Sequence, residues 1–226
     1  MLIKVLQPKW NHLKIPFRLL RQCSSNASSV PAKNNNNEEF TDWKEKLHAT
    51  MNVYENFITP EEEDSLLKDV GPYLKRLRYE YAHWDNMIHG YRETEFLKWN
   101  EDNVKIINKV REKAFPPGMP QLGLVHVLDL AEDGWIKPHV DSTRFCGEVI
   151  ATISLLSDCI MRLTYVGHEK EYWDDFLIPR RSLYVMKGVA RHKYSHAVLS
   201  KKESIYKGKV VDKLRRISVI CRSEPE

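Results

Sequence analysis

The chain has 226 residues, of which 42% are hydrophobic and 29% are charged. This length and composition predict one globular domain with a short appendage. No uncharged apolar stretch has the length of a membrane span, which excludes an integral membrane protein. The four cysteines are widely spaced and include no C-x-x-C pair, so they predict neither a disulfide framework nor a zinc ribbon. Cys159 and Cys221 lie in apolar runs and are predicted to be buried thiols, which favours a reducing compartment.

Residues 1–37 differ in composition from the rest of the chain. They contain six Lys or Arg residues and no Asp or Glu, which leaves 29 basic and 31 acidic residues in 38–226. A Ser-rich, acid-free segment whose apolar residues are interrupted by basic ones is typical of a mitochondrial transit peptide. A basic arm that contacts nucleic acid is the alternative. We therefore predict a transit peptide and spacer in 1–37, a folded domain in 38–226, and a location in the mitochondrial matrix.

Two helices are predicted in the first half of the domain. Thr59-Pro60-Glu61-Glu62 has the pattern of a helix N-terminus with a capping box, and Leu66, Leu67, Val70 and Leu74 follow at helical spacing. Gly71-Pro72 is expected to bend or break this helix. A second helix is predicted after Asn100, with Val104, Ile107 and Val110 on one face.

The second half of the domain changes to strand patterns. Short β-prone segments are separated by turn or charged residues, and a turn is expected at 131–134. Because no helical pattern lies between the strands, a parallel α/β sheet is excluded and a mainly-β sandwich or jelly roll with flanking helices is predicted. The predicted strands are 122–130, 149–156, 160–166, 173–178, 182–186 and 216–222.

A candidate metal site lies at His139-Val-Asp141, with His196 further along the chain. Residues two apart on a strand point to the same face, so both side chains can contact one ion. Two imidazoles and one carboxylate leave three octahedral positions open, as a non-haem Fe(II) oxygenase requires. Zinc accepts overlapping ligands and is the alternative metal.

The last predicted strand contains two arginines at alternating positions. Alternation places Arg216, Ser218, Ile220 and Arg222 on one face. If that face is buried, the guanidinium groups need an anionic partner, since an unpaired buried charge is costly. A dicarboxylate co-substrate would supply the partner, whereas on an outward face both arginines would simply be solvated.

The H-x-D motif, the distal histidine and the terminal R-x5-R together resemble the AlkB family of iron- and 2-oxoglutarate-dependent dioxygenases, over about residues 54–222. The segments HVLDLAEDGWIKPHVDS, SLY and RRISVICR resemble a mitochondrial branch of that family. The resemblance implies a double-stranded β-helix that binds Fe(II) through His139, Asp141 and His196. It also implies that Arg216 pairs with the distal carboxylate of 2-oxoglutarate, that Arg222 helps to hold this co-substrate, and that Tyr184 donates its hydroxyl to it.

The implied reaction couples decarboxylation of 2-oxoglutarate with O2 to oxidation of a C–H bond. The chain departs from the nucleobase-repairing members at Leu128-Asp-Leu130, where they carry Asn-x-Tyr, and at Ser218, where they carry Asn. We therefore expect hydroxylation of a protein side chain. By resemblance, we also expect a role in programmed necrosis after alkylation damage and in energy and fatty-acid metabolism. Demethylation of mitochondrial RNA and a non-catalytic interaction protein remain the alternatives.

The segment 76–99 is rich in aromatic residues and arginine. Such residues can stack on bases and contact phosphates, as in the lids of nucleic-acid-acting relatives. Four acidic residues dilute the positive charge, and aromatic side chains in a small domain commonly pack in the core. Packing is therefore favoured over base recognition for this segment.

Overall fold

The computed structural model describes residues 42–81 and 87–225. The predicted transit peptide lies outside these residues and stays a prediction. The helices are α1 (Trp43–Thr50), α2 (Pro60–Leu74), α3 (Glu101–Ala114) and α4 (Gly188–His192). The strands are β1 (Met51–Tyr54), β2 (Ile88–Phe96), β3 (Val125–His139), β4 (Val149–Leu155), β5 (Cys159–Tyr165), β6 (Trp173–Ile178), β7 (Leu183–Lys187), β8 (Tyr194–Val198), β9 (Ile205–Tyr206), β10 (Lys209–Val210) and β11 (Arg216–Arg222).

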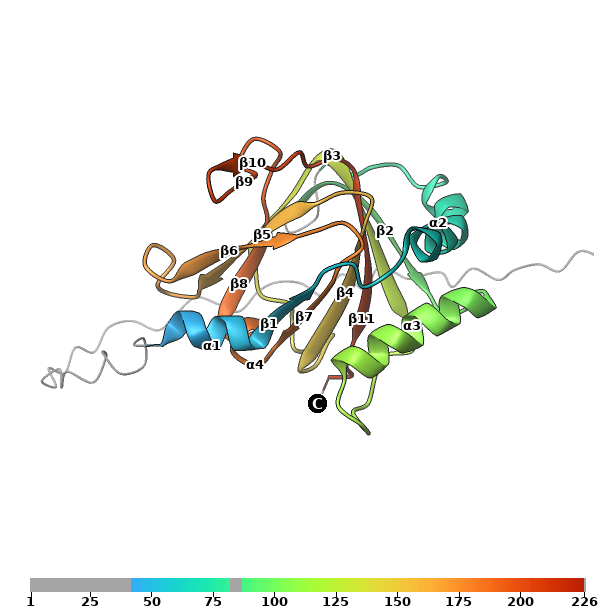
Figure 1. Cartoon of the computed structure of the whole chain (residues 1–226), viewed down its shortest axis with the longest axis horizontal. Coiled ribbons are helices and arrows are strands. Elements are labelled where there is room, and N and C mark those ends of the chain that lie inside the picture. Colours follow the sequence, from blue (N-terminus) through green and yellow to red (C-terminus); the bar gives the residue numbers. More distant parts are fainter. Residues whose placement is uncertain (1–41, 82–86, 226) are drawn as a thin grey trace, which may run out of the picture. The chain divides into compact units, whose positions relative to one another are not determined.

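Nine of these strands form one antiparallel sheet. Its order is β1-β7-β4-β11-β3-β8-β5-β6, and β2 pairs with the free side of β3. The sheet curls nearly to closure, with α2 and α3 on its outer side (Figure 1). The predicted mainly-β jelly roll with flanking helices is therefore confirmed. Sequence patterns missed β1, β2 and β8, which are short or irregular in their polarity.

Helix α2 begins where the predicted capping box lies. The Glu62 amide donates to Thr59 Oγ1 at 3.1 Å and the Thr59 amide donates to Glu62 Oε2 at 2.8 Å, which is a complete capping box. The predicted break at Gly71-Pro72 is wrong, because α2 continues through Pro72 to Leu74. Of the three residues predicted on one face of α3, Ile107 and Val110 are buried together with Ile106, whereas Val104 is exposed.

The predicted turn at 131–134 is also wrong, because β3 runs without interruption through these residues to His139. A Cβ atom on Gly134 would lie 2.6 Å from the Gly90 carbonyl oxygen of β2. The absence of a side chain at Gly134 therefore allows β2 to pack closely against β3, and the glycine does not form a turn. The pairing of β2 with β3 shifts register here, since His89 pairs with Trp135 and Tyr91 with Leu130, so residues 131–134 have no paired residue on β2 except near Gly90.

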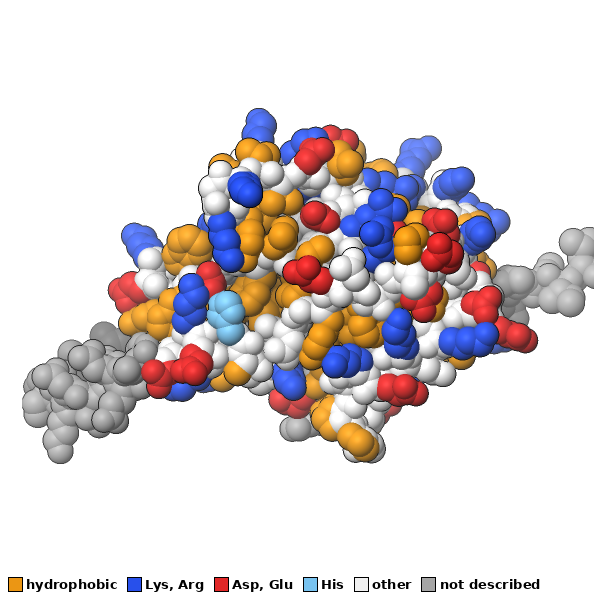
Figure 2. Space-filling view, in the orientation of Figure 1, with side chains coloured by type: hydrophobic (Ala, Val, Ile, Leu, Met, Phe, Trp, Pro, Cys, Tyr) orange, Lys and Arg blue, Asp and Glu red, His pale blue; other side chains and the backbone are white. Residues whose placement is uncertain are grey.

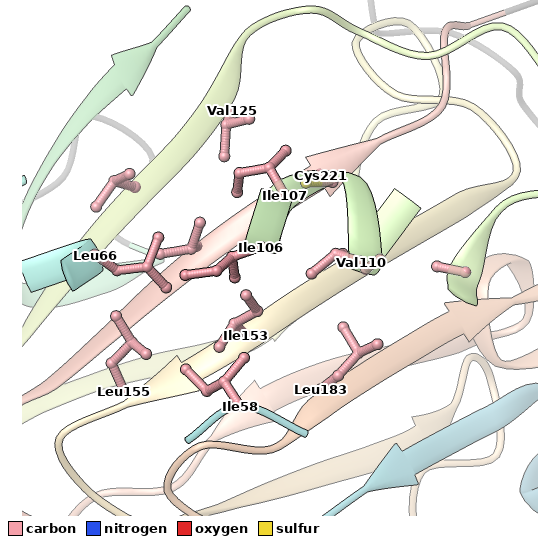
Figure 3. Packing of buried hydrophobic residues seen from close by; sticks show 14 of the residues in the cluster. Ile58, Leu66, Ile106, Ile107, Val110, Val125, Ile153, Leu155, Leu183 and Cys221 are labelled. Carbon is pink, nitrogen blue, oxygen red and sulfur yellow. The ribbon is translucent and has the colours of Figure 1, made fainter. Parts of the chain in front are cut away.

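Two hydrophobic cores lie on opposite faces of the same strands. The outer core packs α2 and α3 against alternate residues of β4, β11 and β3, among them Ile153, Leu155 and Cys221 (Figure 3). The inner core lies inside the curled sheet and includes Leu128, Met161 and Tyr184. Cys159 and Cys221 are buried free thiols, as predicted. No helix in the described ranges has both the length and the apolarity to cross a membrane.

Candidate active site

The three predicted metal ligands meet at one end of the β3–β8 pair. His139 is the last residue of β3, and its Cα partner on β8 is His196. Asp141 lies two residues beyond the end of the strand, so a loop and not strand alternation brings its carboxylate to the histidines. The ligand atoms of all three residues lie within 4.8 Å of one another. The structure therefore brings together the metal-binding residues that the sequence predicts.

The geometry around Asp141 suits a single metal ion. Its Oδ1 lies 3.5 Å from His139 Nε2, and its Oδ2 lies 3.8 Å from His196 Nε2. His139 Nδ1 lies 3.0 Å from the Lys137 carbonyl oxygen, which can only accept a hydrogen bond. Nδ1 therefore carries the proton, and the Nε2 lone pair lies on the side of Asp141.

The electrostatics favour the metal-binding protonation states of His196 and Asp141. Burial lowers the pKa of His196 to about 4, so its imidazole is neutral near pH 7. Burial acts to raise the pKa of Asp141, but the hydrogen bond with His139 and the charges of His196 and Arg191 outweigh it and hold the pKa well below its usual range. A neutral imidazole and an ionised carboxylate are the forms that coordinate a divalent cation.

A cavity of about 120 Å³ lies inside the curled sheet beside these residues. Arg216, Ser218, Ile220 and Arg222 all line it, so of the two orientations left open for this face of the last strand the inward one is observed. Its other lining residues are His139, Asp141, His196, Ile88, His126, Leu128, Ile136, Ile150, Thr152, Met161, Tyr184, Met186 and Val198.

Arg216 is buried in this cavity with its hydrogen-bonding capacity only partly used. Its exposed fraction is 1%, and its Nε donates to Ser154 Oγ at 2.8 Å. Its Nη2 has no hydrogen-bond partner among the described residues. A buried cation with an unused donor fits an anionic ligand such as a carboxylate.

Tyr184 lines the same cavity from β7. It is the Cα partner of Thr152 on β4, which in turn pairs with Ile220 on β11. Burial raises the pKa of Tyr184, so the phenol keeps its proton and can donate a hydrogen bond. Tyr184 and Arg216 thus present donors to one cavity, as a carboxylate ligand requires.

The second arginine lies nearer the surface. Arg222 is 19% exposed, and its Nη2 donates to Glu95 Oε1 at 3.2 Å. His126 makes a similar contact, with its Nε2 2.9 Å from Glu93 Oε2. Strand register puts Glu93 and Glu95 of β2 opposite Leu128 and His126 of β3, which both line the cavity. Glu93 and Glu95 are thus half-exposed carboxylates in contact with two lining residues of the cavity, His126 and Arg222, and we call them the acidic rim.

The residues that depart from the nucleobase-repairing pattern have clear positions. Leu128 and Ser218 line the cavity, where they place an apolar group and a small hydroxyl. Asp129 is fully buried on the opposite face, with ion pairs to Arg92 at 2.7 Å and Arg215 at 2.8 Å. Asp129 therefore holds β2, β3 and β11 together.

Sequence reasoning missed Ser154, which orients Arg216. A signal was present, because Thr152 and Ser154 are polar residues at alternate positions of an otherwise apolar strand. Ala151, Ile153 and Leu155 between and beside them face the outer core. Because the hydroxyls of this strand lie only on its inner face, they indicate a polar site inside the sheet.

The aromatic segment 76–99 is described in part, since the central residues 82–86 lie outside the described ranges. Tyr91 and Phe96 of β2 are buried in the two cores, and Tyr79 donates to Asp129 at 3.1 Å. Tyr81 is 52% exposed. Most of the described aromatic side chains of this segment therefore pack against the domain.

Comparison with known proteins agrees with this geometry. Residues 23–222 match the family model of the 2OG-Fe(II) oxygenase superfamily. The chain is also 48% identical over 181 residues to the mitochondrial alpha-ketoglutarate-dependent dioxygenase alkB homolog 7 of Mus musculus, and this match covers 80% of the chain and 81% of the relative. The chain belongs to the AlkB family of this superfamily. It is an Fe(II)- and 2-oxoglutarate-dependent dioxygenase of the mitochondrial type.

Solved structures share the fold at low sequence identity. OsALKBH1 aligns with a TM-score of 0.53 and 13% identity, covering 76% of this chain and 97% of that one. A prolyl hydroxylase from Trichoplax adhaerens, in complex with a hypoxia inducible factor peptide fragment, aligns with a TM-score of 0.54 and 10% identity, covering 81% and 87%. At these identities the likeness is one of fold, and it supports the jelly roll alone.

Proposed function

We propose that His139, Asp141 and His196 bind the iron and that Arg216, Tyr184 and Arg222 hold 2-oxoglutarate. The donor set fits Fe(II), because two imidazoles and one carboxylate are the ligands of this enzyme class. When bound, iron and 2-oxoglutarate supply the oxidation of a C–H bond by O2. The unused Nη2 donor of buried Arg216 is the observation that carries the co-substrate assignment.

The chain's own residues have three tasks in this reaction. The triad fixes the position of the iron, and Ser154 orients the Arg216 guanidinium through its Nε. Tyr184 donates its hydroxyl proton in a hydrogen bond to the co-substrate without losing it, since burial keeps the phenol protonated. Apolar walls such as Leu128 and Met161 limit the access of water to the reacting atoms.

The substrate we propose is a side chain of a mitochondrial matrix protein. The acidic rim contacts His126 and Arg222, which line the cavity, and so adds negative charge beside it. Affinity for nucleic acid comes mainly from neutralisation of phosphates by Lys and Arg, and carboxylates oppose it. Glu93 and Glu95 therefore favour a polypeptide over RNA as the substrate beside this cavity.

The charge of the domain supports the same choice. Residues 38–226 carry 29 basic and 31 acidic side chains. On the face shown in Figure 2, basic and acidic side chains are interspersed. A protein that tracks a phosphate backbone typically gathers its basic residues on one face or along one groove.

The direct test compares mitochondria that contain the wild-type enzyme with mitochondria that contain the Asp141→Ala variant. Mass spectrometry of their proteins should find peptides that gain one oxygen atom only with the wild type. RNA from the same mitochondria should show equal methylation in both samples. Methyl groups lost from RNA only with the wild type, with no oxidised peptide, would instead establish an RNA demethylase.

By resemblance to its mitochondrial relatives, we also propose a role in programmed necrosis after alkylation damage and in energy and fatty-acid metabolism. We expect this role to require the dioxygenase activity. Cells lacking the enzyme should then survive a methylating agent better than cells with the wild type, and Asp141→Ala should behave like the deletion. Restored cell death with Asp141→Ala would show that the role does not need the iron.

A further inference from the structure

Asp141 lies where the sheet gives little support. The last paired residue of β3 is His139, so no ladder hydrogen bond holds the loop that follows. Val140 is 40% exposed and Phe145 is 66% exposed, so the outer part of this loop gains little from burial. A ligand on such a loop needs another contact to keep its carboxylate in place.

Arg191 provides contacts to this loop from across the fold. It belongs to α4, directly before β8 and five residues before His196, and its exposed fraction is 1%. Its Nη1 donates to the Asp141 carbonyl oxygen at 2.8 Å, and its Nε donates to the Gly147 carbonyl oxygen at 3.2 Å. Its Nη2 lies 3.1 Å from both the carbonyl oxygen and the Sγ of Cys146.

Arg191 contacts the backbone of the loop and not the carboxylate of Asp141. Arg191 binds the main chain of Asp141 and leaves both carboxylate oxygens on the side of the histidines. Within residues 42–81 and 87–225, no carboxylate lies within ion-pair distance of Arg191. A buried guanidinium bound only by loop carbonyls and a thiol fixes the path of that loop, because each lost bond would leave a buried group unsatisfied.

The short helix that carries Arg191 is itself fixed. The Ala190 amide donates to Thr50 Oγ1 at 3.1 Å, which ties α4 to the end of α1. At the other end of the loop, the Gly147 amide donates to the Ser223 carbonyl oxygen at 3.0 Å. The loop from Asp141 to Gly147 is thus held between α4 and the end of β11.

We infer that Arg191 is a positioning residue that holds Asp141 in its metal-binding place before the metal arrives and couples it to the His196 strand. This inference rests on the proposed metal ligands. Partners that orient a ligand typically change metal affinity by roughly 10- to 100-fold when they are lost. Arg191 would orient Asp141 through a hydrogen bond to its main-chain carbonyl and not to its carboxylate.

The test measures Mn(II) binding to the metal-free protein by calorimetry, together with thermal unfolding of the metal-free protein. Arg191→Lys keeps the charge but loses the planar fork, and it should weaken Mn(II) binding by roughly 10- to 100-fold. Arg180→Lys is the control, since Arg180 binds the buried Glu63 at 2.8 Å and lines no part of the cavity. It should lower the unfolding temperature and leave Mn(II) binding unchanged.

The Asp141→Ala variant distinguishes the proposed metal site from the proposed positioning role of Arg191. If Asp141→Ala binds Mn(II) like the wild type, the proposed metal site itself is wrong. If Asp141→Ala loses Mn(II) while folded Arg191→Lys binds it normally, only the role of Arg191 is overturned.

Hydrogen exchange of the wild type tests the inference without any variant. The Cys146 and Gly147 amides donate within the loop and to Ser223, so both should be protected in the metal-free protein. Rapid exchange of both amides until Mn(II) is added would show that the metal, and not Arg191, orders this loop.

Discussion

Alternate residues of β4 and β11 point to the two faces of the sheet, and these two faces have different roles. The outer face presents Ile153, Leu155 and Val219 to the helices, all with no exposed surface. The inner face presents Thr152, Ser154 and Arg216, which are as deeply buried but polar. The outer face therefore supplies stability by apolar burial, whereas the inner face keeps a charge and hydroxyls that only a ligand can fully satisfy.

The largest effect is expected at the metal site. Asp141→Ala should abolish succinate formation from 2-oxoglutarate, because two histidines alone do not hold the iron in this class of site. The metal-free protein should also lose some stability at neutral pH, because the interactions that lower the pKa of Asp141 stabilise the folded state. Asp102→Ala, which removes an exposed carboxylate of α3, is the control. Residual turnover in Asp141→Ala near the wild-type rate would contradict the inner-face assignment.

The outer face should show the opposite response. Ile153→Ala is expected to lower the free energy of unfolding by about 2–5 kcal/mol, since it leaves a cavity in a closely packed core. Urea unfolding measures this loss, and Val104→Ala on the exposed side of α3 should cost far less. The folded fraction should keep the wild-type KM for 2-oxoglutarate. A large rise in that KM would show that the two faces are not separable.

A smaller, pH-dependent effect is expected at Lys213, just before β11. Burial lowers the pKa of Lys213 to about 8, while its ammonium donates to the Ala131 and Glu132 carbonyl oxygens at 3.3 and 3.1 Å. Between pH 8 and the usual lysine pKa near 10.4, the unfolded chain binds more protons than the folded one. This group therefore makes the free energy of unfolding rise with pH in that window, and its contribution is lost as pH falls through about 8.

Urea unfolding at pH 8 and at pH 10 measures this dependence. Lys213→Met should remove the rise, whereas Lys202→Met at an exposed position should keep it. An equal rise in wild type and Lys213→Met would assign the dependence to other groups.

The smallest effect is expected at the acidic rim. Glu93→Gln should raise the affinity for a generic single-stranded RNA by no more than a few-fold, because it removes one repulsive charge. Filter binding at several salt concentrations measures it, and Glu45→Gln on α1 is the control. A lower RNA affinity of Glu93→Gln would contradict the proposal that the acidic rim repels nucleic acid.

Local pattern was enough to predict much of the site. The H-x-D spacing and the alternation of Arg216 with Arg222 are properties of neighbouring residues, and the structure places these residues at one cavity. The capping box at Thr59 was predictable for the same reason. These features depend on spacing within one element. The distal His196 joins the H-x-D residues through the pairing of β8 with β3.

Features that depend on packing between distant segments were not predictable. Gly134 has the composition of a turn, and only the approach of β2 shows why β3 continues through it. Asp141 reaches the histidines from a loop that Arg191 holds from 50 residues away. Neither contact leaves a periodic trace in the sequence, because each depends on tertiary position.

The central claim is that the inner face keeps Arg216 for an anionic co-substrate and not for stability. Its most direct test is thermal unfolding of wild type and Arg216→Met, each with and without 2-oxoglutarate in the presence of Mn(II). We expect 2-oxoglutarate to raise the unfolding temperature of the wild type only, and unliganded Arg216→Met to be at least as stable as the wild type, since it loses a buried unpaired donor. A variant that 2-oxoglutarate still stabilises, or that is several kcal/mol less stable without it, would contradict the claim.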